Sequence, residues 1–121
     1  QLGDGTRISR LIPVAVQGGL VFTALSSGTY HTCGLTNASV AYCWGGSTSG
    51  QLGDGTIHIE RLSPVAVLGG LVFTGLSAGT HHTCGLTVAG AAYCWGSNAA
   101  GQLGDGMMNV DRLTPVAVIR P

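Results

Sequence analysis

The stretch that decides the fold runs from His82 to Gly96. Residues 82–87 read HTCGLT, residues 88–90 read VAG, and residues 91–96 read AAYCWG. Two short segments that flank a loop ending in glycine predict a β-hairpin with a three-residue loop. In that register Cys84 lies directly opposite Cys94, and Gly85 lies opposite Tyr93, whose ring we expect to cover the glycine.

The same hairpin occurs earlier in the chain. Residues 31–36 read HTCGLT and residues 41–45 read AYCWG, which places Cys33 opposite Cys43. Residues 13–63 align with residues 64–114 without a gap, and 34 of the 51 aligned positions are identical. Similar hairpins separated by a fixed period predict a tandem-repeat protein.

The repeat divides the chain into four parts. We expect the end of a preceding repeat, two complete repeats and the start of another, at residues 1–12, 13–63, 64–114 and 115–121. The segment QLGDG recurs in the first three parts, beginning at Gln1, Gln51 and Gln102, and a one-residue length difference after its first copy predicts a surface loop.

The composition argues against several classes of function. The 121 residues include no lysine and only 8% charged residues, and the formal net charge is zero at pH 7. We therefore expect no nucleic-acid partner, and no apolar run approaches the roughly 18 residues of a membrane span. The chain begins at Gln1 without an initiator Met, which is expected of a processed chain or of an excerpt.

Each repeat is expected to supply four short strands. In the second repeat these are Pro64–Val67, Leu71–Ser77 and the two arms of the cysteine hairpin. Proline is tolerated at the start of a strand, and the second segment alternates in character as a strand does. Four short strands every 51 residues are the spacing of a β-propeller blade, so we expect an all-β fold.

The combined motifs resemble a known family. The segments are GQLGDGT at 50–56, PVAV at 64–67, SAGTHHTCGL at 77–86 and YCWGSN at 93–98. Together they resemble the RCC1-type repeat of the regulator of chromosome condensation family, in a cysteine-containing version similar to repeats of exported bacterial proteins. The resemblance implies a propeller of about seven four-stranded blades. It implies no single activity, because fold is not function.

Two and a third repeats cannot close a ring by themselves. The open edges and terminal faces predict one of three arrangements: an excerpt of a longer propeller, a ring closed by several copies, or a head-to-tail filament. In the ring, the overhanging strand Pro115–Val118 is expected to complete a neighbour's blade.

The four cysteines are expected to form two disulfides, Cys33–Cys43 and Cys84–Cys94, one in each hairpin. Each would stabilise the fold by roughly 2–3 kcal/mol. Disulfides predict an oxidising compartment, hence an extracellular or cell-surface location. The alternative is a zinc site that adds His31 or His82 to a cysteine pair, but the usual close Cys-x-x-Cys spacing is missing.

The other motif residues are assigned structural roles. His31 and His82 are expected to fix the turn before the third strand, and Trp44 and Trp95 to pack between blades rather than to form an exposed platform for a sugar. Aspartates in the Gly-Asp-Gly turns are expected to accept backbone hydrogen bonds and to pair with a recurring arginine. These residues are Asp54, Asp105, Arg61 and Arg112.

Asn37 lies in an Asn-Ala-Ser sequon at the tip of the first hairpin, where a glycan could be attached. No repeat supplies a nucleophile beside a base, and one carboxylate per turn falls short of a calcium cage, so we predict no catalytic residue, metal or cofactor.

We therefore expect a non-enzymatic, extracellular structural or adhesive protein that self-associates through its blades into a ring or filament. The alternatives are a secreted protein-binding or inhibitory propeller that uses its rim loops, and a fragment of a larger RCC1-repeat surface protein.

Overall fold

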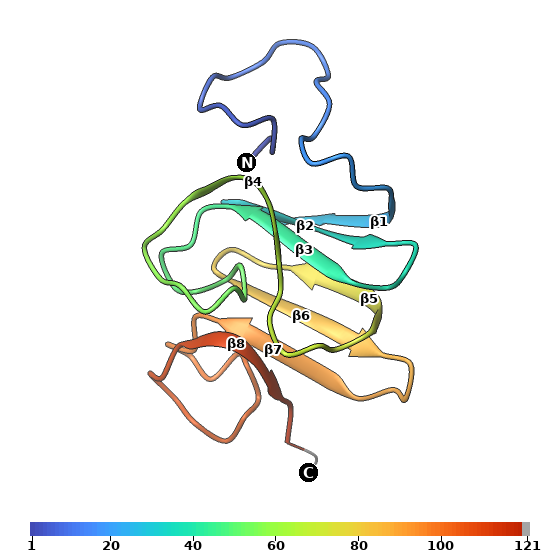
Figure 1. Ribbon diagram of the computed structural model, residues 1–121. Helices are drawn as coiled ribbons and strands as arrows, with labels where there is room; N and C mark the ends of the chain where they lie inside the picture. The colour runs from blue at the N-terminus through green and yellow to red at the C-terminus, as the bar shows by residue number, and fades with distance from the viewer. Residues whose placement is uncertain (120–121) are drawn as a thin grey trace.

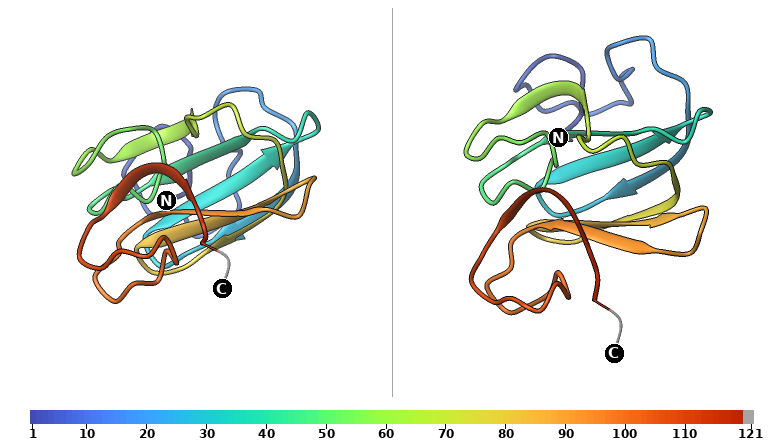
Figure 2. Two further views of the ribbon diagram at one scale, coloured as in Figure 1. Left: turned by 90° about the horizontal axis from the view of Figure 1, so that it is seen from below. Right: turned by 60° about the horizontal axis from the view of Figure 1, so that its bottom comes forward.

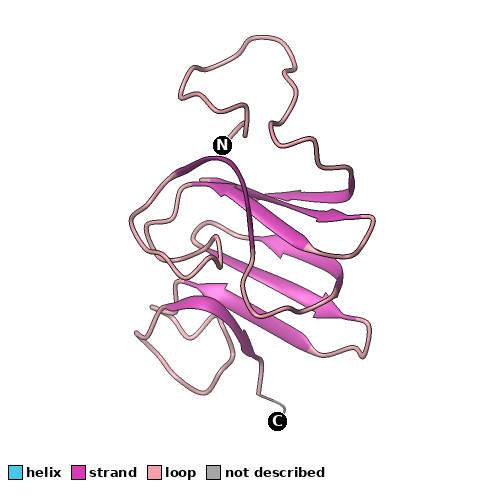
Figure 3. Ribbon diagram, viewed as in Figure 1, coloured by secondary structure: helices cyan, strands magenta, loops and turns pink. Residues whose placement is uncertain are grey.

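The computed structural model describes residues 1–119 and consists of two four-stranded antiparallel sheets (Figures 1 and 3). Sheet A contains β1 (Phe22–Ser27), β2 (His31–Thr36), β3 (Ala41–Gly45) and β4 (Arg61–Ala66), in that spatial order. Sheet B repeats the order with β5 (Phe73–Ala78), β6 (His82–Thr87), β7 (Ala92–Gly96) and β8 (Arg112–Ala117). The all-β prediction is confirmed, and residues 120 and 121 of the expected third repeat lie outside the described part of the chain.

No helix within residues 1–119 is long and apolar enough to cross a membrane.

The register of both hairpins is as predicted. Cys84 faces Cys94 and Cys33 faces Cys43 in the two ladders. Gly90 takes the left-handed position of its loop, with φ of +79°, and Ser39 takes the equivalent position with φ of +62°. The hairpin loop therefore fixes the pairing in both repeats even where the glycine is replaced.

The prediction that Tyr93 covers Gly85 is wrong. A Cβ atom added to Gly85 would lie 2.5 Å from Cδ1 of Phe73, so the ring that lies against this glycine comes from β5. Phe22 lies against Gly34 in the same way. Tyr93 is the cross-strand partner of Gly85 in the ladder.

The sheets are offset from the sequence repeats. The segment Pro64–Val67 was expected to be the first strand of the second repeat, but it overlaps β4, the edge strand that pairs with β3. Likewise Pro115–Val118 overlaps β8 and completes sheet B of its own chain rather than a neighbour's blade. A local sequence pattern predicts a strand but not its partner, which here lies in the preceding repeat.

The two sheets lie as successive layers and do not form a closed ring (Figures 1 and 2). We call the side of each sheet nearer the preceding repeat its upstream face, and the other its downstream face. The buried core lies between the downstream face of sheet A and the upstream face of sheet B, and it comprises Cys33, Leu35, Ala41, Cys43, Leu52, Phe73 and Trp95.

Candidate interface between repeats

The packing between the sheets is the best-developed site in the molecule. Trp95 is fully buried, and its ring packs against Phe73 at a centroid distance of 5.7 Å. Both face the Cys33–Cys43 pair of sheet A within one core. Burying these large rings contributes several kcal/mol to holding successive sheets together.

The tryptophan of each sheet also packs against the loop that precedes that sheet. Gly3 lies so close to Trp44 that an added Cβ would be 2.6 Å from its Nε1, and Gly53 lies equally close to Trp95. Trp44 Nε1 donates a hydrogen bond to the carbonyl of Gln1 (2.8 Å). Each tryptophan therefore joins a sheet to its preceding Gly-Asp-Gly loop, and neither is an exposed platform.

The cysteines stand at disulfide distance in both hairpins. The sulfur atoms of Cys33 and Cys43 are 2.11 Å apart, and those of Cys84 and Cys94 are 2.09 Å apart. The first pair is completely buried between the sheets, whereas Cys84 lies half-buried on the downstream face of sheet B.

His31 connects the two sheets through a buried hydrogen-bond chain. Its Nε2 lies 2.7 Å from Oγ1 of Thr83. Because Thr83 donates its only hydroxyl proton to the carbonyl of Gln51 (2.9 Å), its oxygen must accept from His31, which fixes the proton on Nε2. Burial, and to a lesser extent the rings of His82 and His81, lowers the pKa of His31 to about 4.

This differs from the predicted role of the histidines. The ring of His31 does lie against Gly28 in the turn before β2, and that of His82 lies against Gly79 in the equivalent turn. The hydrogen bond of His31, however, reaches Thr83 in the next repeat. No sequence pattern within one repeat could reveal a partner 52 residues away.

The Gly-Asp-Gly turns have the structure that was expected. Asp54 accepts hydrogen bonds from the backbone and hydroxyl of Thr56 and pairs with Nε of Arg61 at 2.9 Å. Burial alone would raise the pKa of Asp54, but these hydrogen bonds outweigh it and lower the pKa below its ordinary value. Arg112 pairs with Asp105 at 2.7 Å, and this hydrogen bond holds the pKa of Asp105 low.

Both halves of the interface between sheets recur, partly uncovered, at the ends of the stack. Leu35 on the downstream face of sheet A is 3% exposed, but its equivalent in sheet B, Leu86, is 47% exposed. Leu25 on the upstream face of sheet A is 63% exposed, whereas its equivalent Leu76 packs against the core. Leucines that pack inside the molecule are thus presented to solvent at opposite ends, whereas Trp44 and Cys94, the equivalents of Trp95 and Cys43, stay buried there.

A second feature lies at one end of the strands, which we call the loop rim. It comprises the β1–β2 and β5–β6 turns and the β3–β4 and β7–β8 loops. Most positions that differ between the repeats lie there, at 27, 30, 46–49 and 56–60. The sequence contained this signal, but only the strand topology gathers these positions at one end.

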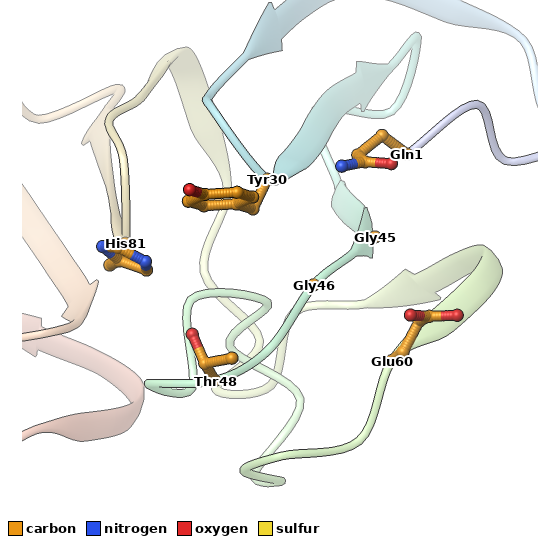
Figure 4. A pocket seen from close by; sticks show the side chains of 7 residues that line it. All are labelled: Gln1, Tyr30, Gly45, Gly46, Thr48, Glu60 and His81. Atoms are coloured by element: carbon orange, nitrogen blue, oxygen red, sulfur yellow. The ribbon is translucent and has the colours of Figure 1, made fainter. Parts of the chain in front are cut away.

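A groove of about 230 Å³ opens on the loop rim (Figure 4). Tyr30 and His81 occupy equivalent positions in the two repeats, and their rings stack at 5.2 Å. Thr48 and Glu60 line the groove together with Gln1 and the backbone of Gly45 and Gly46. Asn37 is exposed at the opposite end of the strands, on the hairpin turn.

Within residues 1–119, no three histidine, cysteine, aspartate or glutamate side chains gather where they could hold a metal ion.

Comparison with known proteins places these repeats in a family. Two descriptions of the regulator of chromosome condensation (RCC1) repeat match, one at residues 22–51 and 73–102 and the other at residues 40–86. These matches run across both sheets.

Curated relatives share this sequence pattern. The chain is 36% identical to the ultraviolet-B receptor UVR8 of Arabidopsis thaliana, over 99% of the chain and 28% of the receptor. It is 41% identical to the human probable E3 ubiquitin-protein ligase HERC4, over 75% of the chain and 9% of the ligase. The chain therefore spans less than a third of these relatives.

Solved structures agree on the fold. Yeast RCC1 (Prp20), solved bound to Kap60, has a TM-score of 0.76 at 20% identity and matches 88% of this chain and 26% of its own. Human WBSCR16 has a TM-score of 0.77 at 18% identity, over 87% of this chain and 27% of its own. Family descriptions, sequence relatives and fold coincide, and the chain belongs to the RCC1-repeat family.

Proposed function

We propose that this chain is a non-enzymatic interaction module whose two end faces bind further repeats of its own kind. The observation that carries the proposal is the pair of uncovered faces, since Leu86 and Leu25 occupy the positions that Leu35 and Leu76 bury inside the molecule. An interface made between two sheets of one chain can be made again between sheets of two chains. Copies that join in this way form a ring or a filament.

The two cysteine pairs at disulfide distance support an extracellular or cell-surface location, because such bonds persist in oxidising compartments. A structural or adhesive role on a surface fits this location and the near-identity of the repeats. We also propose that the chain is of the exported bacterial variety of RCC1 repeat. Thiol labelling of the purified protein under denaturing conditions, without reductant, should find no free cysteine.

The solution mass of the chain tests the association. Static light scattering over a range of concentrations should give masses above that of one chain. Losing the burial of the exposed half of a leucine costs about 1 kcal/mol, or about fivefold in affinity, and an arginine there would in addition have its charge buried, so the substitution should weaken association at least tenfold. We expect Leu86→Arg to shift the protein towards a single chain.

Val88→Arg is the matched control, because Val88 is also an exposed apolar residue, 75% exposed against 47% for Leu86, but lies on the hairpin loop beside the face. This variant should associate as the unaltered chain does. A single-chain mass at every concentration, or equal effects of the two variants, would contradict the proposal.

The loop rim supports a second function, the binding of another protein. Variation is concentrated there while the faces between sheets are nearly invariant, as expected if the rim recognises partners. Yeast RCC1 (Prp20) was solved bound to Kap60, and its binding to Gsp1p and histones is described. A partner captured from a surface extract should be lost with Tyr30→Ser and retained with Val88→Arg; equal capture by both would exclude the groove.

A further inference from the structure

The segment before sheet A has the sequence of a fourth strand. Residues 10–16 read RLIPVAV, residues 61–67 read RLSPVAV, and residues 112–118 read RLTPVAV. The second and third copies contain β4 and β8, each paired with the strand before it in space. The first copy is not a strand and has no paired strand within the described residues.

Nevertheless, residues 3–17 already have the shape of the loop and strand that they resemble. Arg10 pairs with Asp4 at 3.1 Å, as Arg61 does with Asp54. The backbone N–H of Gln17 donates to the carbonyl of Gly3 (2.7 Å). The same closing bond joins residues 68 and 53 at 2.8 Å and residues 119 and 104 at 2.7 Å.

This segment is held in place by sheet A. The backbone N–H of Gly5 donates to the carbonyl of Leu62 in β4 (2.9 Å), and Trp44 donates to the carbonyl of Gln1. Its outer side has no neighbour, since Leu11 is fully exposed and Ile12 is largely exposed. Figures 1 and 2 show the segment beyond sheet A, with no further strand on its outer side.

The internal interface shows what such a strand does. After β4 the chain runs through residues 67–72 into β5, so a strand paired with sheet A leads directly into the sheet that packs on sheet A. By the same connection, a copy that packs its sheet A on another copy's sheet B carries its residues 10–16 to the edge of β7. That edge is occupied by β8, which has the same sequence pattern.

We infer that two copies of this chain join by strand exchange, in which residues 10–16 of one copy replace residues 112–118 of the other on β7. This inference rests on the proposed association through the sheet faces. The backbone hydrogen bonds that β7 loses with residues 112–118 are replaced by equivalent bonds with residues 10–16 of the other copy, because the two segments have nearly the same sequence. The gain comes from the faces, where Leu86 of one copy becomes covered by the upstream face of the other.

Two matched double variants test the exchange with opposite expected signs. The valines of the spare strand are replaced in V14D/V16D, and their equivalents in β8 are replaced in V116D/V118D. Light scattering should show V14D/V16D as a single chain where the unaltered protein associates. V116D/V118D should associate at a concentration at least tenfold lower, because β7 is easier to free.

A covalent trap reports the pairing directly. Tyr93 faces Ala117 in the β7–β8 ladder, and Ala15 is the equivalent of Ala117. In the full chain carrying Tyr93→Cys and Ala15→Cys, a peptide crosslinked between positions 15 and 93 of different copies is expected by mass spectrometry after mild oxidation. Tyr93→Cys with Ala117→Cys should instead crosslink within one copy.

The outcomes separate this inference from the function on which it rests. If the protein associates but V14D/V16D associates equally well and no 15–93 crosslink forms, strand exchange is wrong while face-to-face association stands. If the unaltered protein remains a single chain at every concentration, both are wrong.

Discussion

Acid should weaken this fold through one buried histidine. His31 is completely buried, and its neutral Nε2–H form is the one that completes the chain to Thr83 and Gln51. Its pKa is about 4 in the folded protein against 6.5 for an ordinary histidine. The unfolded chain therefore binds more protons between these values, so stability is complete above about pH 6.5 and is lost as the pH falls towards 4.

The size of the effect follows from the difference between the two pKa values. Each pKa unit corresponds to about 1.4 kcal/mol, so the free energy of unfolding should fall by about 2–3 kcal/mol between pH 7 and pH 4.5. The aspartates of the Gly-Asp-Gly turns have pKa values lowered from 3.8, so their stabilisation is lost only at lower pH. The chosen window therefore isolates the histidine.

Urea unfolding measures this loss, with the buried tryptophans as the fluorescence probe. His31→Gln should remove most of the pH dependence whatever its effect at pH 7. His58→Asn is the matched control: His58 is exposed with φ of +62°, and the equivalent position holds Asn109 with φ of +60°. If the unaltered chain and His31→Gln lost the same free energy between the two pH values, the argument from burial would be refuted.

Three further outcomes are expected. Gly85→Ala should lower the free energy of unfolding by about 1–3 kcal/mol, because the new methyl group would overlap Phe73; the same change at the uncrowded Gly75, whose equivalent Ala24 is already alanine, tests whether crowding is the cause. Arg61→Ala should lower the melting temperature by a few degrees, through loss of about 1 kcal/mol from the half-exposed pair with Asp54, and an unchanged melting temperature would exclude that contribution. Under native conditions a thiol reductant should reduce the cysteine pair of sheet B before that of sheet A, since only the pair of sheet B reaches solvent. Mass spectrometry of alkylated thiols measures the order, and simultaneous reduction of the two pairs would contradict this.

The local parts of the fold could be predicted because their causes are local. The two-residue period of a strand and a three-residue loop determine that Cys84 faces Cys94, and both lie in one short stretch. The pairing of Arg61 with Asp54 is likewise a contact across seven residues. In such cases the sequence holds all the partners within a single turn or hairpin.

The parts that could not be predicted depend on how repeats stack. The ring over Gly85 comes from a strand that nothing in the hairpin specifies, and the acceptor of His31 lies in the next repeat. The sequence predicts a strand at Pro64–Val67. Its pairing partner is β3 of the preceding repeat, and that pairing requires the chain to turn back and run antiparallel to β3, which the local pattern does not specify. Positions such as 30 and 60 lie together on the loop rim only because the strand topology places the β1–β2 turn and the β3–β4 loop at the same end of the sheet.

The offset between sheets and repeats has a mechanical consequence. Because β4 stays in sheet A while the chain continues into β5, residues 67–72 tether the two sheets. Six residues reach at most about 20 Å when fully extended. Under tension the two sheets can separate by no more than that distance until β4 is pulled away from β3. An array of these units would therefore resist mechanical extension stepwise, because each further extension requires the removal of one strand from its sheet.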